Sequence, residues 1–457
     1  MRKNYQKQMP LMITSIDHPH ATELEGISQI LDANLIIYEW VLQDLTRNIN
    51  HIGAGAEGMS AEQVIRAAII KQMEEYSYED LAFHLLDSVC YRGFCRIGIA
   101  DKGFQKSALC NNIKAITSET WEVINRILVA YGQGTDIEKG KEVRIDCTVV
   151  SSNIHEPRDS NLLWDGVRVL TRMLVQIKER FSEIDDVLFS DHTKRAKRRM
   201  LAILNAKSKK ARKKQYEDLL KVTHKTIKYA ENTVSVLKNH PFENLSLAET
   251  AHCIAEELNE VIGLTYRVID QATRRVIHGE KVPACEKIVS IFEPHTDIII
   301  KDRRDTFFGH KVCLTGGISN LITDCVILDG NPADSQLTDQ MFDRHKEIYG
   351  HYPLKAALDG GFTSKANLAS AKKKGIKDVC FAKKRGLQEE EMCRSSWVYK
   401  RLRRFRAGIE SGISWLKRCF GFGRCMWKTL PSFHSYVWAS IVSANLLTLA
   451  RKRFSLT

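Results

Sequence analysis

The sequence predicts a mixed α/β protein with a helical N-terminal domain, a mixed sheet flanked by helices, and a helical insertion after the first strand of that sheet. Three observations lead to this prediction. Apolar residues repeat at helical spacing up to about residue 135, β-branched residues gather in Val143–Val150, and short apolar runs begin after about residue 284. The expected domains are therefore 1–135, an insertion at 160–283, and a sheet domain made of 136–159 and 284–457.

The N-terminal helices are predicted from their start signals. Ser60 and Gln63 form one capping box ahead of an apolar stripe, and Ser77 and Asp80 begin a second helix. A third amphipathic helix is expected over Ser118–Ala130. Helical domains of this size serve in DNA binding or in dimerisation, and the pattern alone favours neither.

The first predicted strand contains an unusual residue. Asp146 lies inside the β-branched run Val143–Val150, although aspartate is depleted in strands and costly to bury without a partner. Its presence there indicates a bound metal ion or an arginine as its partner. An aspartate that faces a turn or forms an ordinary ion pair is the alternative.

The predicted insertion contains a strongly basic segment. Eleven of the 21 residues in Lys194–Lys214 are Lys or Arg, and they flank the apolar run Met200–Leu204. This pattern is typical of a helix on nucleic acid or of a basic amphipathic helix on a membrane, whereas a solvated hairpin between two helices is the alternative. The residues that we expect to contact DNA are Lys194, Arg195, Lys197, Arg198 and Arg199.

The second half alternates between strands and helices. Four short runs predict an antiparallel meander with a turn at Gly316–Gly317: Ile288–Phe292, Asp297–Lys301, Gly309–Thr315 and Leu321–Leu328. The order that follows is a helix at Asp334–Ile348, a strand at Lys355–Asp359, a helix capped by Ser364, a strand at Asp378–Ala382, and a helix that carries Glu410. A mixed sheet with helices in this order is consistent with the ribonuclease H-like fold.

Three charged residues share one stripe of the last of these helices. At 3.6 residues per turn, Glu410 lies about 40° and Lys417 about 20° around the axis from Arg406. A carboxylate between two cations can hold a metal ion while the cations bind DNA phosphates. A solvated helix face with ion pairs is the alternative.

Asp146, Asp359 and Glu410 are the candidate catalytic carboxylates. Three carboxylates that converge at the ends of central strands would bind two divalent cations, with Mg²⁺ as the favoured ion and Mn²⁺ as a substitute. Asp329 and Asp334 compete for the second position, but Asp329 precedes a Gly-Asn-Pro turn and Asp334 suits a helix N-cap. Asp359 is preferred because Gly360–Gly361 and a capped helix follow it.

These motifs give the chain a resemblance to bacterial insertion-sequence transposases of the DDE class, with an InsH-like N-terminal domain. The motifs are Ile145-Asp-Cys-Thr-Val149, Leu358-Asp-Gly-Gly-Phe-Thr-Ser364, and Arg406 and Glu410 followed by Lys417. The resemblance implies that the three carboxylates bind the metal ions and that Arg406 and Lys417 bind DNA. The family's Tyr-Arg-Glu-Lys signature has its tyrosine where this chain has Arg403, which we also expect to bind DNA.

The resemblance also implies partners. A transposase would bind double-stranded DNA at terminal inverted repeats, cleave it there, and join the 3′-hydroxyl ends to target DNA within a homodimer or larger synaptic complex. A catalytically inactive DNA-binding descendant and a nuclease without strand transfer are the alternatives. The net charge of +13 fits a polyanionic partner. Twelve cysteines without a Cys-x-x-Cys pair indicate a reducing compartment, and no apolar run is long enough to span a membrane. The resemblance then implies a cytoplasmic, nucleoid-associated bacterial protein.

Overall fold

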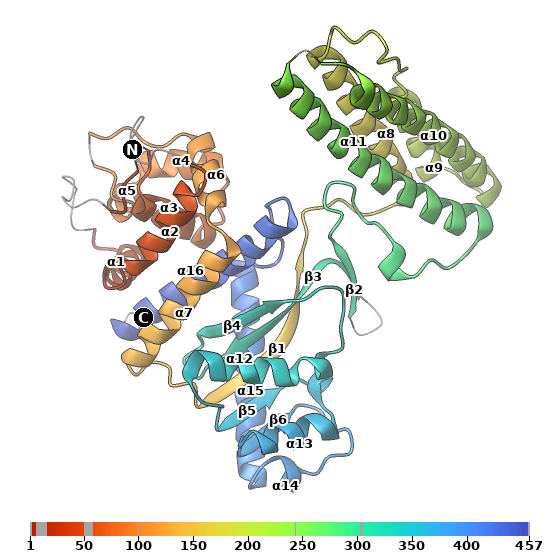
Figure 1. The fold of residues 1–457 in the computed structure, drawn as a ribbon. Coiled ribbons are helices and arrows are strands. Elements are labelled where there is room, and N and C mark those ends of the chain that lie inside the picture. The colour runs from red at the N-terminus through yellow and green to blue at the C-terminus, as the bar shows by residue number, and fades with distance from the viewer. Residues whose placement is uncertain are drawn as a thin grey trace. The chain divides into compact units, whose positions relative to one another are not determined.

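The computed structural model describes residues 2–5, 16–49, 58–98, 100–242, 244–301 and 305–455 (Figure 1). The chain divides into two compact units. Residues 1–152 and 309–457 form the first, which we call the sheet unit, and residues 153–308 form the second, which we call the bundle unit. In the described residues, no helix combines the length and the apolar character that a membrane crossing requires.

The N-terminal part of the sheet unit is helical, as predicted. Both capping boxes form: the Ser60 hydroxyl accepts from the Gln63 N–H, and the Ser77 hydroxyl accepts from the Asp80 N–H. The helices are α1 (Pro19–Asp32), α2 (Ile36–Thr46), α3 (Ala61–Met73), α4 (Tyr78–Asp87), α5 (Val89–Phe94), α6 (Lys106–Ala115) and α7 (Ser118–Gly134). The last of them continues four residues beyond the predicted end at Ala130.

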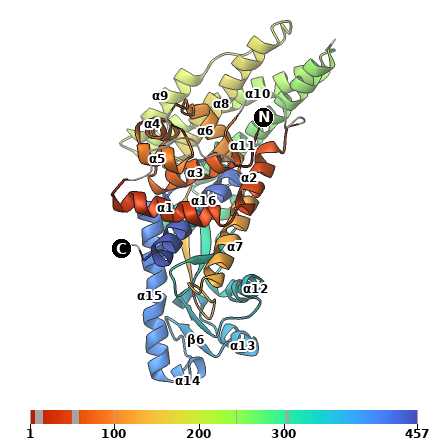
Figure 2. The same cartoon turned by 90° about the vertical axis from the view of Figure 1, so that its left-hand side faces the viewer.

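The C-terminal helix α16 (Leu430–Arg453) packs against these N-terminal helices. It contacts α1, α3 and α7, and Figure 2 shows it among them. Its Asn445 amide donates to the Asn125 side chain of α7 at 2.7 Å and accepts from the Ile322 N–H at 2.9 Å. Residues 1–135 therefore share one hydrophobic core with the C-terminus, and they belong to the same compact unit as the sheet.

The sheet is mixed and confirms the predicted fold class. Its strands are β1 (Glu142–Ser151), β2 (Asp297–Lys301), β3 (Asp305–Gly316), β4 (Ile322–Ile327), β5 (Lys355–Leu358) and β6 (Asp378–Phe381). The order is β2-β3-β1-β5-β6, and β4 also pairs with β3. β3 runs antiparallel to both β1 and β4, whereas β1, β5 and β6 run parallel. This arrangement is consistent with the ribonuclease H-like fold.

Helices cover both faces of the sheet. They are α12 (Thr338–Tyr349), α13 (Lys365–Lys373), the short α14 (Glu389–Met392) and the long α15 (Ser396–Cys419). Figures 1 and 2 show α12 and α15 on opposite faces. Because α15 contacts β1, β5 and β6, one helix spans the three parallel strands of the sheet.

Four packed helices form the main part of the bundle unit. They are α8 (Asp159–Arg180), α9 (Thr193–Leu204), α10 (Lys209–Asn239) and α11 (Leu245–Ala272), and they enclose their own hydrophobic core. The basic segment Lys194–Lys214 is not one helix, because α9 ends at Leu204 and Ser208 caps the start of α10. The segment is thus a hairpin between two helices, with Met200 and Ile203 buried in the bundle.

The predicted strand at Ile288–Phe292 is wrong, because this segment is irregular although Ile288, Val289 and Ile291 are buried. Its backbone groups bind side chains instead of a neighbouring strand. The Gln271 amide accepts from the Ile288 N–H at 2.8 Å and donates to the Ile288 carbonyl oxygen at 3.1 Å. The Ser290 hydroxyl accepts from the N–H groups of Phe292 and Glu293, both at 3.1 Å.

A buried histidine in the sheet unit makes stability depend on pH. His345 of α12 is 2% exposed, and its Nε2 donates to the Gly140 carbonyl oxygen at 2.9 Å. Burial lowers the pKa of His345 to about 4, although the hydrogen bond to Gly140 acts in the opposite direction. The folded protein therefore keeps this imidazole neutral at a pH where the unfolded chain protonates it.

We expect the free energy of unfolding to fall by about 2 kcal/mol between pH 7.5 and pH 5 because of this one group. The sign follows from proton uptake: between pH 6.5 and 4 the unfolded chain binds the proton and the folded chain does not, so acid favours unfolding. Urea unfolding at both pH values measures the loss in the wild type and in His345→Gln. An equal loss in the two proteins would contradict the assignment to His345.

Candidate active site

The two candidate aspartates come from adjacent parallel strands. Ile145 of β1 lies opposite Leu358 of β5. Asp146 and Asp359 are the residues that follow this pair along the two adjacent strands. Asp359 directly follows the end of β5 and precedes a short 3₁₀ turn at Gly360–Phe362. The parallel pairing thus brings together two carboxylates that are 213 positions apart in the sequence.

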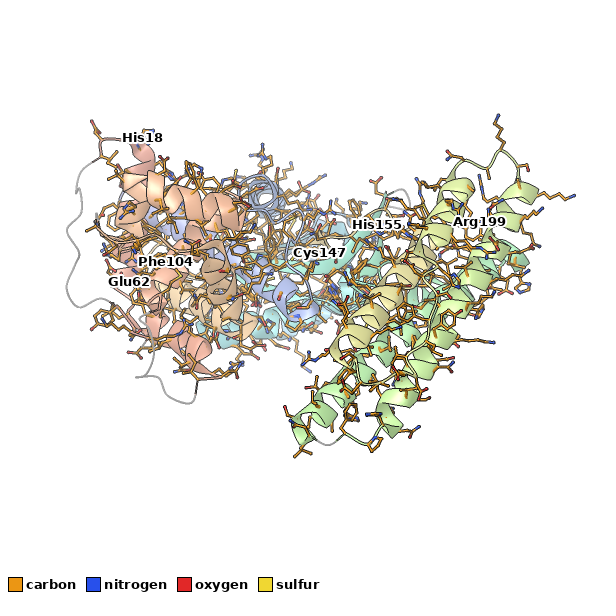
Figure 3. The ribbon with its side chains drawn as sticks, turned by 90° about the horizontal axis from the view of Figure 1, so that it is seen from above. His18, Glu62, Phe104, Cys147, His155 and Arg199 are labelled. Atoms are coloured by element: carbon orange, nitrogen blue, oxygen red, sulfur yellow. The ribbon has the colours of Figure 1, made fainter. Side chains whose placement is uncertain are left out.

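Asp146 is held firmly within β1. Its side chain is 15% exposed, and its Oδ1 accepts from the N–H of Cys147 at 2.7 Å. Cys147, the neighbour of Asp146, is labelled in Figure 3. The sequence predicted a metal ion or an arginine beside this aspartate, and Arg406 Nη1 lies 3.8 Å from its Oδ2.

Arg406 contacts all three candidate carboxylates. Its Nη1 lies 3.0 Å from Asp359 Oδ1, and its Nη2 lies 2.7 Å from Glu410 Oε1, in addition to the contact with Asp146. Helix α15 begins at Ser396, ten residues before Arg406, so Arg406 and Glu410 lie one turn apart on a continuous helix. The three carboxylates therefore converge on one cationic group.

The electrostatics of Arg406 reflect this crowding. Its side chain is 14% exposed, and burial alone would lower the pKa of its guanidinium. The hydrogen bond to Glu410 and the charges of Asp359, Glu410 and Asp146 outweigh burial and raise this pKa. The site thus stabilises positive charge at the point where the carboxylates meet.

Gly408 lets α15 approach the sheet closely. A Cβ at this position would lie 1.9 Å from Nη1 of Arg144, a buried residue of β1. That same Nη1 donates to the Phe405 carbonyl oxygen at 3.1 Å, and the guanidinium lies over the Phe405 ring. Arg144 therefore fixes the helix turn that precedes Arg406. At Gly412 a Cβ would meet nothing within 4 Å, so packing does not explain that glycine.

Arg144 was not predicted from the sequence as part of the site. The signal was an arginine two residues before Asp146 in a strand whose other residues are mostly apolar, together with a glycine in the middle of a long helix. Because alternate residues of a strand share one face, Arg144 and Asp146 project from β1 toward the same side. Arg144 positions α15, while Asp146 contributes the carboxylate.

The donor atoms of the site suit a divalent cation. Oxygens of three carboxylates lie within 4 Å of one guanidinium, and carboxylate oxygen is the ligand that Mg²⁺ prefers. In the residues that the structure describes, however, no group of three or more His, Cys, Asp or Glu side chains is arranged to hold a metal ion by itself. Arg406 provides the physical reason, because its guanidinium lies between the carboxylates. The guanidinium of Arg406 thus already supplies a positive charge among the three carboxylates.

The rival aspartates lie in other surroundings. Asp334 forms an ion pair with Lys311 Nζ of β3 at 2.5 Å, and it does not cap a helix as the sequence predicted, because Ala333 holds that position. Asp329 is exposed after the end of β4. Among the described contacts of Arg406, neither of these aspartates appears, which favours Asp359 as the second carboxylate.

The remaining predicted DNA-binding residues lie in two places. Arg403 is exposed on α15, and Lys417 is half-buried near the end of the same helix. In the bundle unit, α9 exposes Lys194, Lys197 and Arg198, whereas Arg195 and Arg199, the latter labelled in Figure 3, form ion pairs with Asp218 of α10.

Comparison with known proteins gives one match. Residues 293–446 match a family model described as the transposase DDE domain. This range contains Asp359, Arg406, Glu410 and Lys417, while Asp146 precedes it. No curated protein and no solved structure gives a significant match.

Proposed function

We propose that the chain cleaves DNA at terminal inverted repeats and joins the freed ends to target DNA, because residues 293–446 match a family model described as the transposase DDE domain. The observation that carries the proposal is the convergence of Asp146, Asp359 and Glu410 on one cationic group. In metal-dependent phosphodiester cleavage such a carboxylate cluster holds the divalent cations, which stabilise the negative charge that gathers on the phosphate in the transition state.

In this proposal each residue has a role that follows from its place. Asp146, Asp359 and Glu410 would hold two Mg²⁺ or Mn²⁺ ions. Such ions supply Lewis-acid activation of the attacking oxygen and stabilise the leaving oxygen. Arg406 and Lys417 bind phosphates on either side of the scissile bond, and the exposed Arg403 extends this basic stripe.

The proposed reaction has two steps. In the first, water attacks a phosphorus atom at the element end, and the bond to the 3′ oxygen breaks to leave a free 3′-hydroxyl. In the second, that hydroxyl attacks a target phosphodiester and displaces a target 3′ oxygen, so the number of phosphodiester bonds is conserved. Because both element ends must react together, we propose a homodimer or larger synaptic complex.

Incubation with a supercoiled plasmid that bears both element ends tests this function. We expect nicked and linear products in Mg²⁺, strand-transfer products in the presence of target DNA, and no products when EDTA removes the metal. Cleavage that persists in EDTA would contradict the carboxylate mechanism. Cleavage without joined products would indicate a nuclease, and binding without cleavage would indicate an inactive descendant.

We further propose that the exposed basic residues of α9 contact DNA phosphates. Neutralising Lys194, Lys197 and Arg198 together by glutamine should reduce the slope of log affinity against log salt by up to about 2.7, since each phosphate contact contributes about 0.9. Filter binding over a salt series measures this slope.

Arg195 and Arg199 provide the matched control for this experiment. Both are already engaged by Asp218, so their replacement by glutamine should change the slope less than the triple substitution does. An unchanged slope in the triple variant would instead indicate a solvated hairpin.

A further inference from the structure

A pocket of about 660 Å³ lies in the sheet unit, apart from the carboxylates. Its walls come from the end of α3, the start of α4, the end of α15 and the segment up to Tyr436. Four aromatic side chains line it, Tyr76, Tyr78, Trp427 and Tyr436. The volume falls within the range of about 300–1,000 Å³ that is usual for small-molecule sites.

Lys71 of α3 places a buried positive charge on this pocket. The residue is 7% exposed, and its Nζ lies 4.9 Å from the centre of the Tyr78 ring. Among the described carboxylates, none forms an ion pair with it, whereas Arg66 on the same helix pairs with Glu62 and Asp32. Burial lowers the pKa of Lys71 to about 8, and the charge of Glu75, which acts in the opposite direction, only partly offsets the cost of burying the ammonium group.

Two further buried hydrogen-bond donors line the same pocket. The Tyr78 hydroxyl and the Trp427 Nε1 have no hydrogen-bond partner among the described atoms. Buried polar groups in folded proteins are nearly always paired, and an indole N–H can only donate. The residues that line the pocket thus include a buried ammonium group and two unpaired donors, and a ligand that supplies acceptor oxygens would provide partners for them.

The acidic residues on the pocket wall already have partners among the other lining residues. Glu79 pairs with Lys106 Nζ at 2.9 Å, and Glu75 accepts from the Gly421 N–H at 3.1 Å. They therefore offer less competition to an anionic ligand than free carboxylates would. The aromatic side chains provide flat apolar surface, on which a ring can stack.

We propose that this pocket binds one nucleotide, with its phosphate at Lys71, Tyr78 and Trp427 and its base against the aromatic side chains. Lys417 lines the pocket and follows Glu410 by seven residues, about 10 Å along the helix. A nucleotide of the DNA strand that is cut at the carboxylates can therefore reach the pocket. The identification of this nucleotide as part of a DNA strand rests on the proposed function. A free nucleotide would present the same phosphate and base to the pocket.

Binding of thymidine 5′-monophosphate to the full chain tests the pocket itself. Calorimetric titration should show binding that Lys71→Met weakens about tenfold and Tyr78→Phe weakens about threefold. Lys106→Met is the matched control, because Lys106 lines the same pocket but pairs with Glu79, and it should bind as the wild type does. Thymidine and inorganic phosphate should each bind more weakly than the nucleotide. Equal binding by the wild type, Lys71→Met and Tyr78→Phe would overturn the proposal.

Two DNA duplexes distinguish the sources. If the nucleotide comes from a DNA strand, Lys71→Met should weaken binding of a duplex with a single-stranded overhang and leave a blunt duplex unchanged. If Lys71→Met weakens binding of the nucleotide but of neither duplex, the pocket binds free nucleotides. Asp359→Asn should bind the nucleotide normally, so a failure of the catalytic assignment is distinguishable from a failure of the pocket. If Lys71→Met does not fold, nucleotide binding by Tyr78→Phe tests the proposal, because that substitution removes only the hydroxyl.

Discussion

Asp359→Asn is expected to reduce plasmid cleavage by about 100- to 1,000-fold while the protein still binds DNA. The substitution replaces a charged oxygen by a neutral amide of the same size, so it removes half of the negative charge that β1 and β5 bring together. The side chain of Asp359 is 38% exposed, and Asn still offers an oxygen to Arg406, so folding should be little affected. The loss should therefore appear in cleavage and not in the thermal midpoint.

Asp329→Asn is the matched control for this experiment, because Asp329 is an exposed carboxylate of the same domain, remote from Arg406 in its described contacts. We expect it to cleave as the wild type does. Gel analysis of a plasmid that bears the element ends measures both variants, and calorimetry confirms that both are folded. Wild-type cleavage by Asp359→Asn would remove this residue from the catalytic set.

Sequence pattern predicted the elements whose signals are local. The capping boxes at Ser60 and Ser77, the strand around Asp146 and the cap at Ser364 all appear in the structure, because each depends on residues only a few positions apart. The prediction of a strand at Ile288–Phe292 was wrong for the opposite reason. Its apolar residues suit a strand, but the Gln271 side chain takes its backbone hydrogen bonds from 17 positions away, which no local pattern shows.

The candidate site shows the same division. The carboxylates could be proposed from their order along the chain, since each stands at a recognisable place in a strand or helix. Nothing in the sequence indicated that Arg406 contacts all three, or that Arg144 holds α15 through Gly408. These contacts depend on the distance between the helix and the sheet, which only the packed structure determines.

Arg406→Gln is expected to have opposite effects on metal binding and on cleavage. In the structure its guanidinium lies between the three carboxylates, so a divalent cation must compete with it for their oxygens. Hydrogen bonds to charged groups contribute about 1.5–3 kcal/mol each, and the loss of even one such competitor should raise metal affinity by about tenfold or more. Cleavage should nevertheless fall by about 100-fold, because the cation that binds the phosphate is lost.

Electron paramagnetic resonance of free Mn²⁺ measures the affinity, and the plasmid assay measures cleavage. Arg404→Gln provides the matched control, because Arg404 is exposed on the same helix and lies about 200° around the axis from Arg406. It removes the same charge from the chain without touching the carboxylates, so Mn²⁺ affinity should stay unchanged. Weaker Mn²⁺ binding in Arg406→Gln would mean that the guanidinium holds the carboxylates in place for the metal, and a joint rise in affinity and cleavage would mean that it only obstructs the site. The combination of tighter metal binding with slower cleavage is the result that assigns Arg406 both a contact with the carboxylates and a contact with DNA.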